Sequence, residues 1–445
     1  MSVPFLTHER AQGVVARRGG LPVTRARLAG DIAALAAILR PARYVMNLCT
    51  GRYRFVVALG AAMTRGQVTL LPPNDTPVML AQLADAYEGV YILCDREVRD
   101  LPAPVLRIPD LLAGPPRDDV PVFPAAQEAV ILFTSGSTGH PKPQTKTWGA
   151  LVHSTKAAGV TLGVAQLAGG TVFGTVPLQH SYGLESTVML ALQHALAFDA
   201  ARPFFPADVF SALSAAPSPR LLVTTPVHLR ALVLDKSEKP RADFLLSATA
   251  PLAPALARDA EAAFGCPVHE IYGCSEAGQI AARRTVDGPL WTALDGFTLR
   301  QEGDTTYTSS PDILPEEIAL QDVIELLDPT HFVLHGRMGD LVNIAGKRSS
   351  LGYLNAHLNA IEGVHDGVFV IPDAPDGDDG GAVRLMAFVV APGLTAATII
   401  GALRQRIDPA FLPRPLCFVE ALPRNTLGKL PSDALRQLVE NADVR

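Results

Sequence analysis

One short run of glycines and hydroxylated residues that ends in a lysine has the composition of a phosphate-binding loop. It follows an apolar segment at 129–133 and reads Thr134-Ser135-Gly136-Ser137-Thr138-Gly139-His140-Pro141-Lys142. Glycines let the backbone approach a ligand closely, and N–H groups, hydroxyls and a lysine donate to phosphate oxygens. A polar turn has a similar composition. The Gly-x-x-x-x-Gly-Lys-Ser/Thr loop of kinases and ATPases is absent, because Gly136 and Gly139 are too close together and Pro141 precedes Lys142.

A second run combines an aromatic ring, a hydroxyl and a carboxylate at the end of an expected strand. It reads Glu270-Ile271-Tyr272-Gly273-Cys274-Ser275-Glu276. A carboxylate is a hard oxygen ligand that suits Mg²⁺ bridging phosphates, and an aromatic face packs against a base. Alone this pattern is weak, but its position after the phosphate-type loop strengthens it.

Charged residues beside glycines recur in the last third of the chain. Taken alone, these segments are about as consistent with surface loops as with parts of a functional site. A lysine in a glycine-containing tail is usually solvated. The segments are Gln321-Asp322, Gly336-Arg337-Met338-Gly339-Asp340, Gly346-Lys347-Arg348 and Leu422-Pro423-Arg424-Asn425-Thr426-Leu427-Gly428-Lys429.

In this order, the four elements resemble the motifs of the adenylate-forming superfamily of acyl-CoA synthetases, peptide-synthetase adenylation domains and luciferases. The resemblance covers residues 134–429. It implies that ATP and Mg²⁺ convert a carboxylic acid to an acyl-adenylate with release of pyrophosphate. A pantetheine thiol then takes the acyl group.

The resemblance assigns roles to individual residues. Tyr272 would stack on adenine, Ser275 would contact the α-phosphate, and Glu276 would hold Mg²⁺. The segment 247–252 would form the opposite wall of the adenine pocket, and Lys429 would enter the site as the catalytic lysine of adenylation. The residues expected to bind the nucleotide are Thr134, Ser135, Gly136, Ser137, Thr138, Gly139, Lys142, Ala248, Thr249, Ala250, Tyr272, Gly273, Asp322, which would take the ribose hydroxyls, Arg337 and Arg348.

An interdomain hinge is implied two residues after Arg337, where the superfamily usually has Asp or Lys. This sequence has Gly339 there, followed by Asp340, so the hinge is expected at one of these two residues. Glycine tolerates large changes of φ and ψ. The arginine often found three residues after the catalytic lysine is replaced by Ser432.

The segment 177–186 resembles the acyl-pocket lining of aryl-CoA ligases. There His180 would act as the gate between pocket and thiol tunnel, with a catalytic part in the second step, and Tyr182 and Ser186 would face an aromatic acid. The alternative is that Tyr182 is an ordinary core residue and His180 a loop histidine. The short N-terminal part, with segments 47–49 and 71–74, resembles the compact ligases of aryl polyene and xanthomonadin pigment clusters. In those enzymes a hydroxybenzoate-like acid and an acyl carrier protein are typical.

Strands and helices must alternate to position these residues. Helices are expected at Arg52–Thr64 and Pro254–Phe264, and alternation of this kind indicates parallel sheets with ligands at the carboxyl ends of the strands. We expect an α/β fold with a large N-terminal domain, 1–337, of helix-covered mainly parallel sheets. A small mobile α+β domain, 338–445, would carry Lys429. Strands are expected at 44–49, 67–71, 129–133, 171–176, 221–224, 244–246, 268–271, 368–371, 385–390 and 416–419.

Composition excludes several other classes. A net charge of −6 gives no footprint for nucleic acid, and no apolar stretch approaches the ~20 residues of a membrane span. Five dispersed cysteines do not suggest a disulfide framework or a zinc site. The N-terminus lacks the apolar core of a signal peptide, so a cytoplasmic location is expected.

The function predicted from the sequence is ATP-dependent activation of an aryl acid and its transfer to an acyl carrier protein. Alternatives are an aryl- or acyl-CoA ligase that uses free CoA, and an ATP-binding pseudoenzyme on the same fold. The retained Lys429 and Glu276 argue against the pseudoenzyme.

Overall fold

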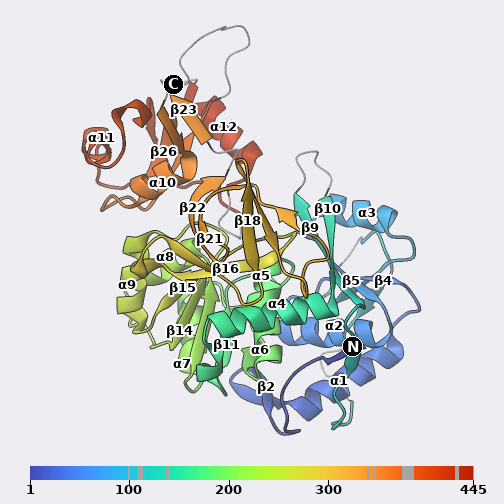
Figure 1. Cartoon of the computed structure of the whole chain (residues 1–445). Coiled ribbons are helices and arrows are strands. Elements are labelled where there is room, and N and C mark those ends of the chain that lie inside the picture. The colour runs from blue at the N-terminus through green and yellow to red at the C-terminus, as the bar shows by residue number, and fades with distance from the viewer. Residues whose placement is uncertain are drawn as a thin grey trace.

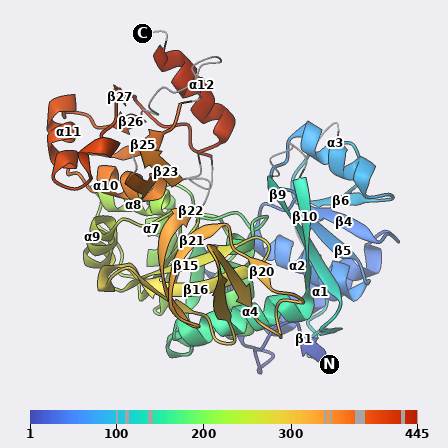
Figure 2. The same ribbon diagram turned by 45° about the horizontal axis from the view of Figure 1, so that its top comes forward.

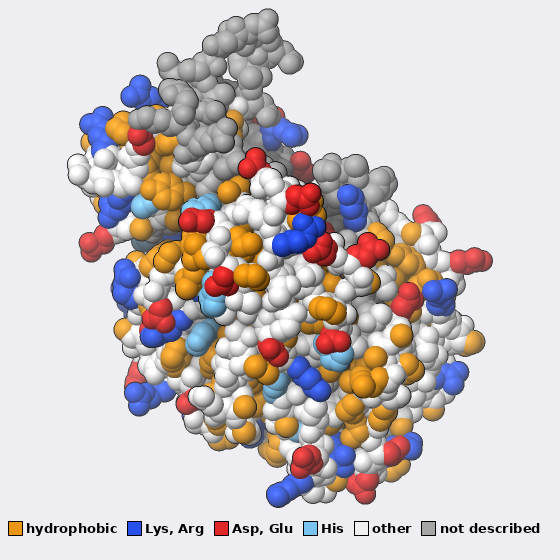
Figure 3. Space-filling model, viewed as in Figure 1, with side chains coloured by type: hydrophobic (Ala, Val, Ile, Leu, Met, Phe, Trp, Pro, Cys, Tyr) orange, Lys and Arg blue, Asp and Glu red, His pale blue; other side chains and the backbone are white. Residues whose placement is uncertain are grey.

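The computed structural model of this 445-residue chain divides into a large part and a smaller C-terminal part (Figure 1). The smaller part contains the elements from Leu341 onward and lies against one end of the large part (Figure 1). In the space-filling view the two parts are in contact, and acidic and basic side chains are interspersed on the visible face (Figure 3). The structure describes residues 1–98, 101–108, 114–135, 141–337, 341–344, 347–372, 385–425 and 430–443.

A six-stranded sheet is built from the first third of the chain. Its inner strands are parallel, and one edge strand, β10, runs antiparallel to its neighbour β9. From edge to edge the strands are β10 (Pro141–Thr147), β9 (Glu128–Ser135), β5 (Val68–Leu71), β4 (Tyr44–Asn47), β6 (Tyr91–Cys94) and β7 (Val105–Arg107).

An eleven-stranded sheet forms the second large layer. A central parallel block from β15 to β2 is extended by antiparallel strands at both ends. In order the strands are β21 (Asp322–Asp328), β22 (His331–Arg337), β17 (Leu290–Ala293), β16 (Gly278–Arg284), β15 (Val268–Cys274), β14 (Phe244–Ser247), β13 (Arg220–Thr224), β11 (Thr171–Gly174), β12 (Ala197–Asp199), β2 (Val14–Arg18) and β3 (Leu21–Thr24).

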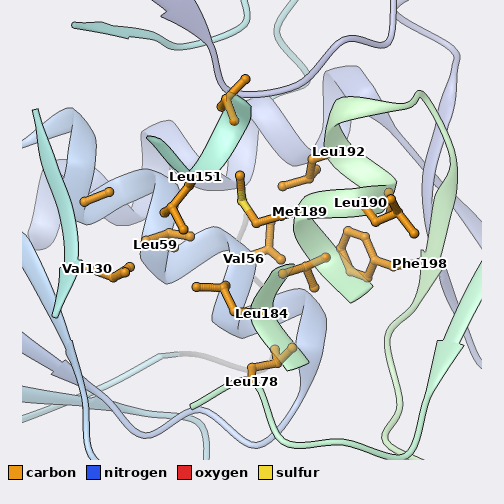
Figure 4. Close-up of a cluster of buried hydrophobic side chains, with 14 of the residues drawn as sticks. Val56, Leu59, Val130, Leu151, Leu178, Leu184, Met189, Leu190, Leu192 and Phe198 are labelled. Carbon is orange, nitrogen blue, oxygen red and sulfur yellow. The ribbon is translucent and has the colours of Figure 1, made fainter. Parts of the chain in front are cut away.

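Helices fill the space between the two sheets and cover their outer faces (Figures 1 and 2). The inner helices are α1 (Arg25–Ile38), α2 (Arg52–Thr64), α4 (Trp148–Thr161) and α6 (Leu190–Gln193), and their apolar side chains share one core cluster with both sheets (Figure 4). The outer helices are α3 (Pro77–Ala86) on the six-stranded sheet and α7 (Pro206–Ser214), α8 (Pro226–Leu234) and α9 (Pro254–Phe264) on the eleven-stranded sheet.

Alternation along the strands explains why two helical layers can pack on one sheet. In β13, Leu221 and Val223 belong to the central core cluster, whereas Leu222 belongs to the outer cluster with α7, α8 and α9. Successive side chains of a strand point to opposite faces, so a strand that is apolar throughout is buried on both. The apolar runs in the sequence are therefore continuous rather than alternating.

The C-terminal part has its own hydrophobic clusters, formed by residues between Val342 and Ala442. The expected boundary at 337/338 falls at the end of β22 and stays a prediction, since residues 338–340 lie outside the described residues. The elements here are β23 (Leu341–Ile344), β24 (Lys347–Ser350), α10 (Leu351–Asn359), β25 (Asp366–Val370), β26 (Met386–Val390), α11 (Ala396–Arg404), η5 (Pro409–Phe411), β27 (Leu416–Phe418) and α12 (Ser432–Asp443).

Smaller elements complete the large part, and the predicted α/β architecture is confirmed. No helix among the described residues combines the length and apolarity that crossing a membrane requires. The remaining elements are β1 (Ser2–Pro4), β8 (Val122–Pro124), η1 (Val164–Leu167), α5 (Ser181–Gly183), the π-helix η2 (Leu184–Met189), η3 (Thr285–Asp287), β18 (Thr298–Glu302), β19 (Thr305–Ser309) and β20 (Ile318–Ala319).

Candidate active site

Two β-hairpins from different sheets meet at the site. The first joins β9 to β10 and contains the phosphate-type loop, and the second joins β15 to β16 and has Ser275 and Glu276 at its tip. Lys146 on β10 donates a hydrogen bond through Nζ to the backbone oxygen of Glu276. Sequence motifs 130 residues apart are thereby brought to one place.

The β9–β10 hairpin places the two ends of the phosphate-type loop side by side. Thr134 pairs with Lys142 and Ser135 with Pro141 in antiparallel register, and Lys142 is exposed. The predicted phosphate-binding residues Gly136, Ser137, Thr138 and Gly139 lie outside the described residues.

Lys146 lies in a polar environment whose residues received no role in the sequence analysis. Glu185 is 1% exposed and accepts hydrogen bonds from the hydroxyls of Ser154, at 3.2 Å, and Ser181. Lys146, Ser154 and Glu185 also line one small cavity beside Gly278. Burial lowers the pKa of Lys146, whereas the negative charges of Glu185 and Glu276 oppose that shift.

The residues expected to contact adenine and ribose are in direct contact. The Tyr272 hydroxyl donates to Oδ2 of Asp322 at 2.7 Å, and the Tyr272 ring packs against Trp291 with centroids 5.8 Å apart. Asp322 is the cross-strand partner of Arg337, whose side chain is not described. A side chain on Gly273 would place its Cβ 2.1 Å from a backbone oxygen of the same hairpin, so this exposed position requires glycine.

The expected second wall of the adenine pocket follows β14. Ser247 at the end of β14 pairs with Glu270 on β15, so the segment Ala248–Ala250 leaves the sheet at the same edge as Tyr272. Thr249 has φ of +80°, a conformation that β-branched residues rarely adopt. Such strained residues cluster at functional sites, where the surrounding structure holds them.

The expected acid-binding segment forms α5 and the π-helix η2, next to these hairpins. His180 precedes α5, and its backbone oxygen accepts from Leu184 N. The Tyr182 hydroxyl lies 3.0 Å from the backbone oxygens of both Thr224 and Leu246, and burial raises its pKa well above the ordinary value. Tyr182 therefore ties α5 to the carboxyl ends of β13 and β14.

Ser186 is 1% exposed, and its hydroxyl accepts a hydrogen bond from Gln279 Nε2 at 2.9 Å. This bond connects the π-helix to β16, the returning strand of the second hairpin. The expected roles of His180, Tyr182 and Ser186 toward an acid stay predictions.

The C-terminal motif, 422–429, is anchored through Arg424. Arg424 donates through Nε and Nη2 to the two carboxylate oxygens of Asp366 on β25, at 2.7 and 2.8 Å. Lys429 lies outside the described residues, as do the hinge candidates Gly339 and Asp340. Arg348 lies on β24, and nothing is described of its side chain.

The residues present fit a magnesium ion held mainly by phosphates. Glu276 is exposed at the hairpin tip, with Ser275 partly exposed beside it. Mg²⁺ in nucleotide sites takes one or two protein carboxylates, with the phosphates and water as its other ligands. A cluster of three or more His, Cys, Asp or Glu side chains is not found among the described residues, and this mode of binding does not require one.

Comparison with known proteins identifies the family to which this fold and these two hairpins belong. The chain belongs to the AMP-binding enzyme family, whose model matches residues 33–340. A 4-coumarate–CoA ligase of Rhodobacter capsulatus is 32% identical over 303 residues, covering 67% of this chain and 74% of the relative. A 3-hydroxybenzoate–CoA/4-hydroxybenzoate–CoA ligase of Thauera aromatica is 25% identical and covers 69% and 66%.

Solved structures show the same fold along nearly the whole chain. ATP-bound MatB from Rhodopseudomonas palustris superposes with a TM-score of 0.81 at 18% identity, covering 98% of this chain and 97% of MatB. A benzoate CoA ligase from Burkholderia xenovorans LB400 gives a TM-score of 0.80 at 19% identity, covering 96% and 97%. The superfamily membership and the fold inferred from the sequence are thus confirmed.

Proposed function

We propose that this enzyme activates an aromatic carboxylic acid with MgATP and passes the acyl group to the pantetheine thiol of an acyl carrier protein. The observation that carries the proposal is the junction of the two hairpins, where Lys146 meets the backbone of Glu276. It joins the phosphate-type loop to the acidic motif, next to the Tyr272–Asp322 pair.

The first step is attack of the acid's carboxylate on the α-phosphate, which releases pyrophosphate. Backbone N–H groups of the loop 134–139 and the Ser275 hydroxyl donate hydrogen bonds to phosphate oxygens, and Lys429 stabilises the negative charge that develops there. Glu276 would hold Mg²⁺, which would supply positive charge against the phosphates. Donors already in place stabilise such charge without the cost of reorganisation.

The second step is attack of a thiol on the acyl carbonyl, with AMP as the leaving group. His180 is the gate through which the thiol reaches the acid, and the C-terminal part moves about Gly339 or Asp340 so that Lys429 leaves the site. The position of Lys429 in the sequence, beyond the large part, supports this division of labour, because domain motions commonly complete one catalytic arrangement at a time.

An aromatic acid is favoured by two lines of support. The relatives are named for 4-coumarate and hydroxybenzoate, which are aromatic acids. Tyr182 and Ser186 lie on the expected acid-binding segment, whose ends are fixed to β13, β14 and β16. The same relatives are named as CoA ligases, so free CoA is the second candidate acceptor.

The test is a pyrophosphate-release assay with a panel of acids, followed by thiol transfer. We expect AMP and pyrophosphate with hydroxybenzoate- or cinnamate-like acids, at higher kcat/KM than with acetate or long-chain fatty acids. Formation of ADP in place of AMP rejects the reaction class. A fatty acid with the highest kcat/KM rejects the substrate class alone. Thioester formation on a phosphopantetheinylated carrier protein, compared with free CoA, decides the acceptor.

A further inference from the structure

A buried carboxylate joins the two expected walls of the adenine pocket. Glu270 is 2% exposed and lies on β15, two residues before Tyr272. Its Oε1 accepts a hydrogen bond from Leu252 N at 2.9 Å, and its Oε2 accepts from Arg283 Nε at 2.7 Å and the Thr285 hydroxyl at 2.6 Å. One side chain therefore contacts the loop after β14 and the strand β16.

The hydrogen bond to Leu252 holds a strained loop. The loop 248–252 contains Thr249 at φ of +80°, and a left-handed β-branched residue persists only where neighbouring contacts enforce it. Leu252 is 2% exposed and packs in the outer core cluster, so the loop is fixed at this end by its side chain and by its N–H.

The second partner, Arg283, links Glu270 to the other wall of the expected adenine pocket, which contains Tyr272. Its guanidinium carbon lies 4.4 Å from the ring centroid of Trp291, which packs against Tyr272, and the Tyr272 hydroxyl reaches Asp322. The Arg283 side chain is 15% exposed and the Glu270 side chain 3%. Removing one charge of such a pair leaves the other largely buried and uncompensated.

We propose that Glu270 is a positioning residue for the nucleotide: it sets the separation of loop 248–252 from Tyr272. This inference rests on the proposed function, in which these two elements bind adenine. Glu270 acts through Leu252 and Arg283 rather than by contact with the reacting atoms. Its loss should therefore weaken nucleotide binding and leave acid binding almost unchanged.

The chain contains a second glutamate that can serve as a control for Glu270, because it bonds an arginine next to the one that Glu270 bonds. Glu261 on α9 accepts hydrogen bonds from Val268 N at 2.9 Å and from Arg284 Nε at 3.0 Å. It thus joins a backbone N–H and an arginine as Glu270 does, but at the start of β15 and away from Tyr272. A general loss of stability should appear when either glutamate is changed, whereas weaker nucleotide binding should appear only when Glu270 is changed.

The experiment compares Glu270→Gln with Glu261→Gln. The measurements are the KM for ATP and for the acid in pyrophosphate release, the Kd for AMP by calorimetry, and the unfolding midpoint. We expect Glu270→Gln to raise the KM for ATP and the Kd for AMP about tenfold, the loss expected for a charged hydrogen bond. The acid KM should stay within about twofold, and Glu261→Gln should leave all three constants within about twofold.

If Glu270→Gln does not fold, Arg283→Lys provides the second variant, because it keeps the charge and loses the guanidinium that lies over Trp291. In this variant too we expect the KM for ATP and the Kd for AMP to rise, by a smaller factor than in Glu270→Gln, while the acid KM stays almost unchanged. Equal effects on ATP and acid, or AMP binding as tight as in the wild type, overturn the inference. A wild type that binds AMP but releases no pyrophosphate with any acid rejects the proposed function instead.

Discussion

At the scale of single residues, charged side chains near the site hold backbone atoms. Lys146 donates to the backbone of Glu276, and Glu270 accepts from the backbone of Leu252. A charge removed from water is costly unless it is paired and hydrogen-bonded, and Glu270, which is 2% exposed, has fixed partners. Both contacts lie beside residues that are predicted to bind the nucleotide.

A buried histidine far from the site should govern stability in acid. His8 is 6% exposed, and burial lowers its pKa from 6.5 to about 4. Between these values the unfolded chain binds a proton that the folded chain excludes. Stability from neutral His8 is therefore complete above pH 6.5 and is lost as the pH falls toward 4, by about 3 kcal/mol.

His8→Gln tests this prediction through urea unfolding at a series of pH values. The free energy of unfolding of the wild type should fall more steeply than that of the variant between pH 6.5 and pH 4. Above pH 7 the difference between the two proteins should be constant. Parallel curves across the acid range would show that folding leaves the pKa of His8 unchanged.

At the scale of elements, the hydroxyl of one phenol links α5 to the eleven-stranded sheet. Tyr182→Phe removes the donor to the Thr224 and Leu246 oxygens, and we expect a loss of about 1–2 kcal/mol of stability. Because α5 belongs to the expected acid-binding segment, the acid KM should rise severalfold, while the KM for ATP stays within about twofold.

Tyr91→Phe is the control for Tyr182→Phe. Tyr91 is 1% exposed, and its hydroxyl donates to Gln67 at 2.8 Å in the six-stranded sheet, remote from α5. The control should lose similar stability and keep both KM values. An unchanged acid KM in Tyr182→Phe would remove α5 from the acid pocket.

Elements with local signals could be predicted from the sequence, and those without them could not. The predicted helices Arg52–Thr64 and Pro254–Phe264 match α2 and α9. In α9, Pro254 occupies the first turn and Gly265 adopts the left-handed cap, so both ends are encoded locally. By contrast β10, Pro141–Thr147, is an edge strand without apolar residues, so no hydrophobic pattern predicts it.

The residues of the candidate site also divide into those that could be predicted from the sequence and those that could not. Tyr272 and Asp322 could be found because they stand in recognisable motifs, and the structure joins them by a hydrogen bond. Lys146 and Glu185 could not be found, since each acts through a contact made by the fold. The available signal for Glu185 was its place between Leu184 and Ser186 in the segment 177–186, where no role was assigned to it.

At the scale of the whole molecule, the C-terminal part contacts the large part beside α8 (Figure 2). Arg230 on α8 is close enough to the Asp366–Arg424 pair for both charges to act on its pKa, which burial lowers. The segment that leads to Lys429 is thus anchored next to the large part. Movement of the C-terminal part would separate Arg230 from this pair.

The two half-reactions should respond differently to changes in the C-terminal part. Lys429→Ala should slow adenylation by a factor of roughly 10²–10³ or more, as expected for one preorganised charge-stabilising group, and still transfer acyl from supplied acyl-adenylate. Gly339→Pro should impair thioester formation and spare adenylation, because proline fixes φ near −65°. Pyrophosphate exchange and thioester formation are measured on each variant.

Two results would contradict the mechanism in which the C-terminal part takes a different position for each half-reaction, or the location of its hinge. Equal slowing of both half-reactions in Lys429→Ala means that the lysine does not serve adenylation alone. Two unaffected half-reactions in Gly339→Pro move the hinge away from this residue, and Asp340 becomes the next position to change.

The contact between Lys146 and Glu276 has a consequence for how the protein is made. The ribosome adds about 5–20 residues per second, so roughly ten seconds separate the emergence of these two partners, which are 130 residues apart. The six-stranded sheet is complete once residue 147 has emerged, but β2 waits for β12, its neighbour in the eleven-stranded sheet. The nascent chain thus holds one finished sheet and the β2–β3 hairpin, whose other edge stays unpaired while the rest is synthesised, and chaperones would find their exposed apolar surface in that interval.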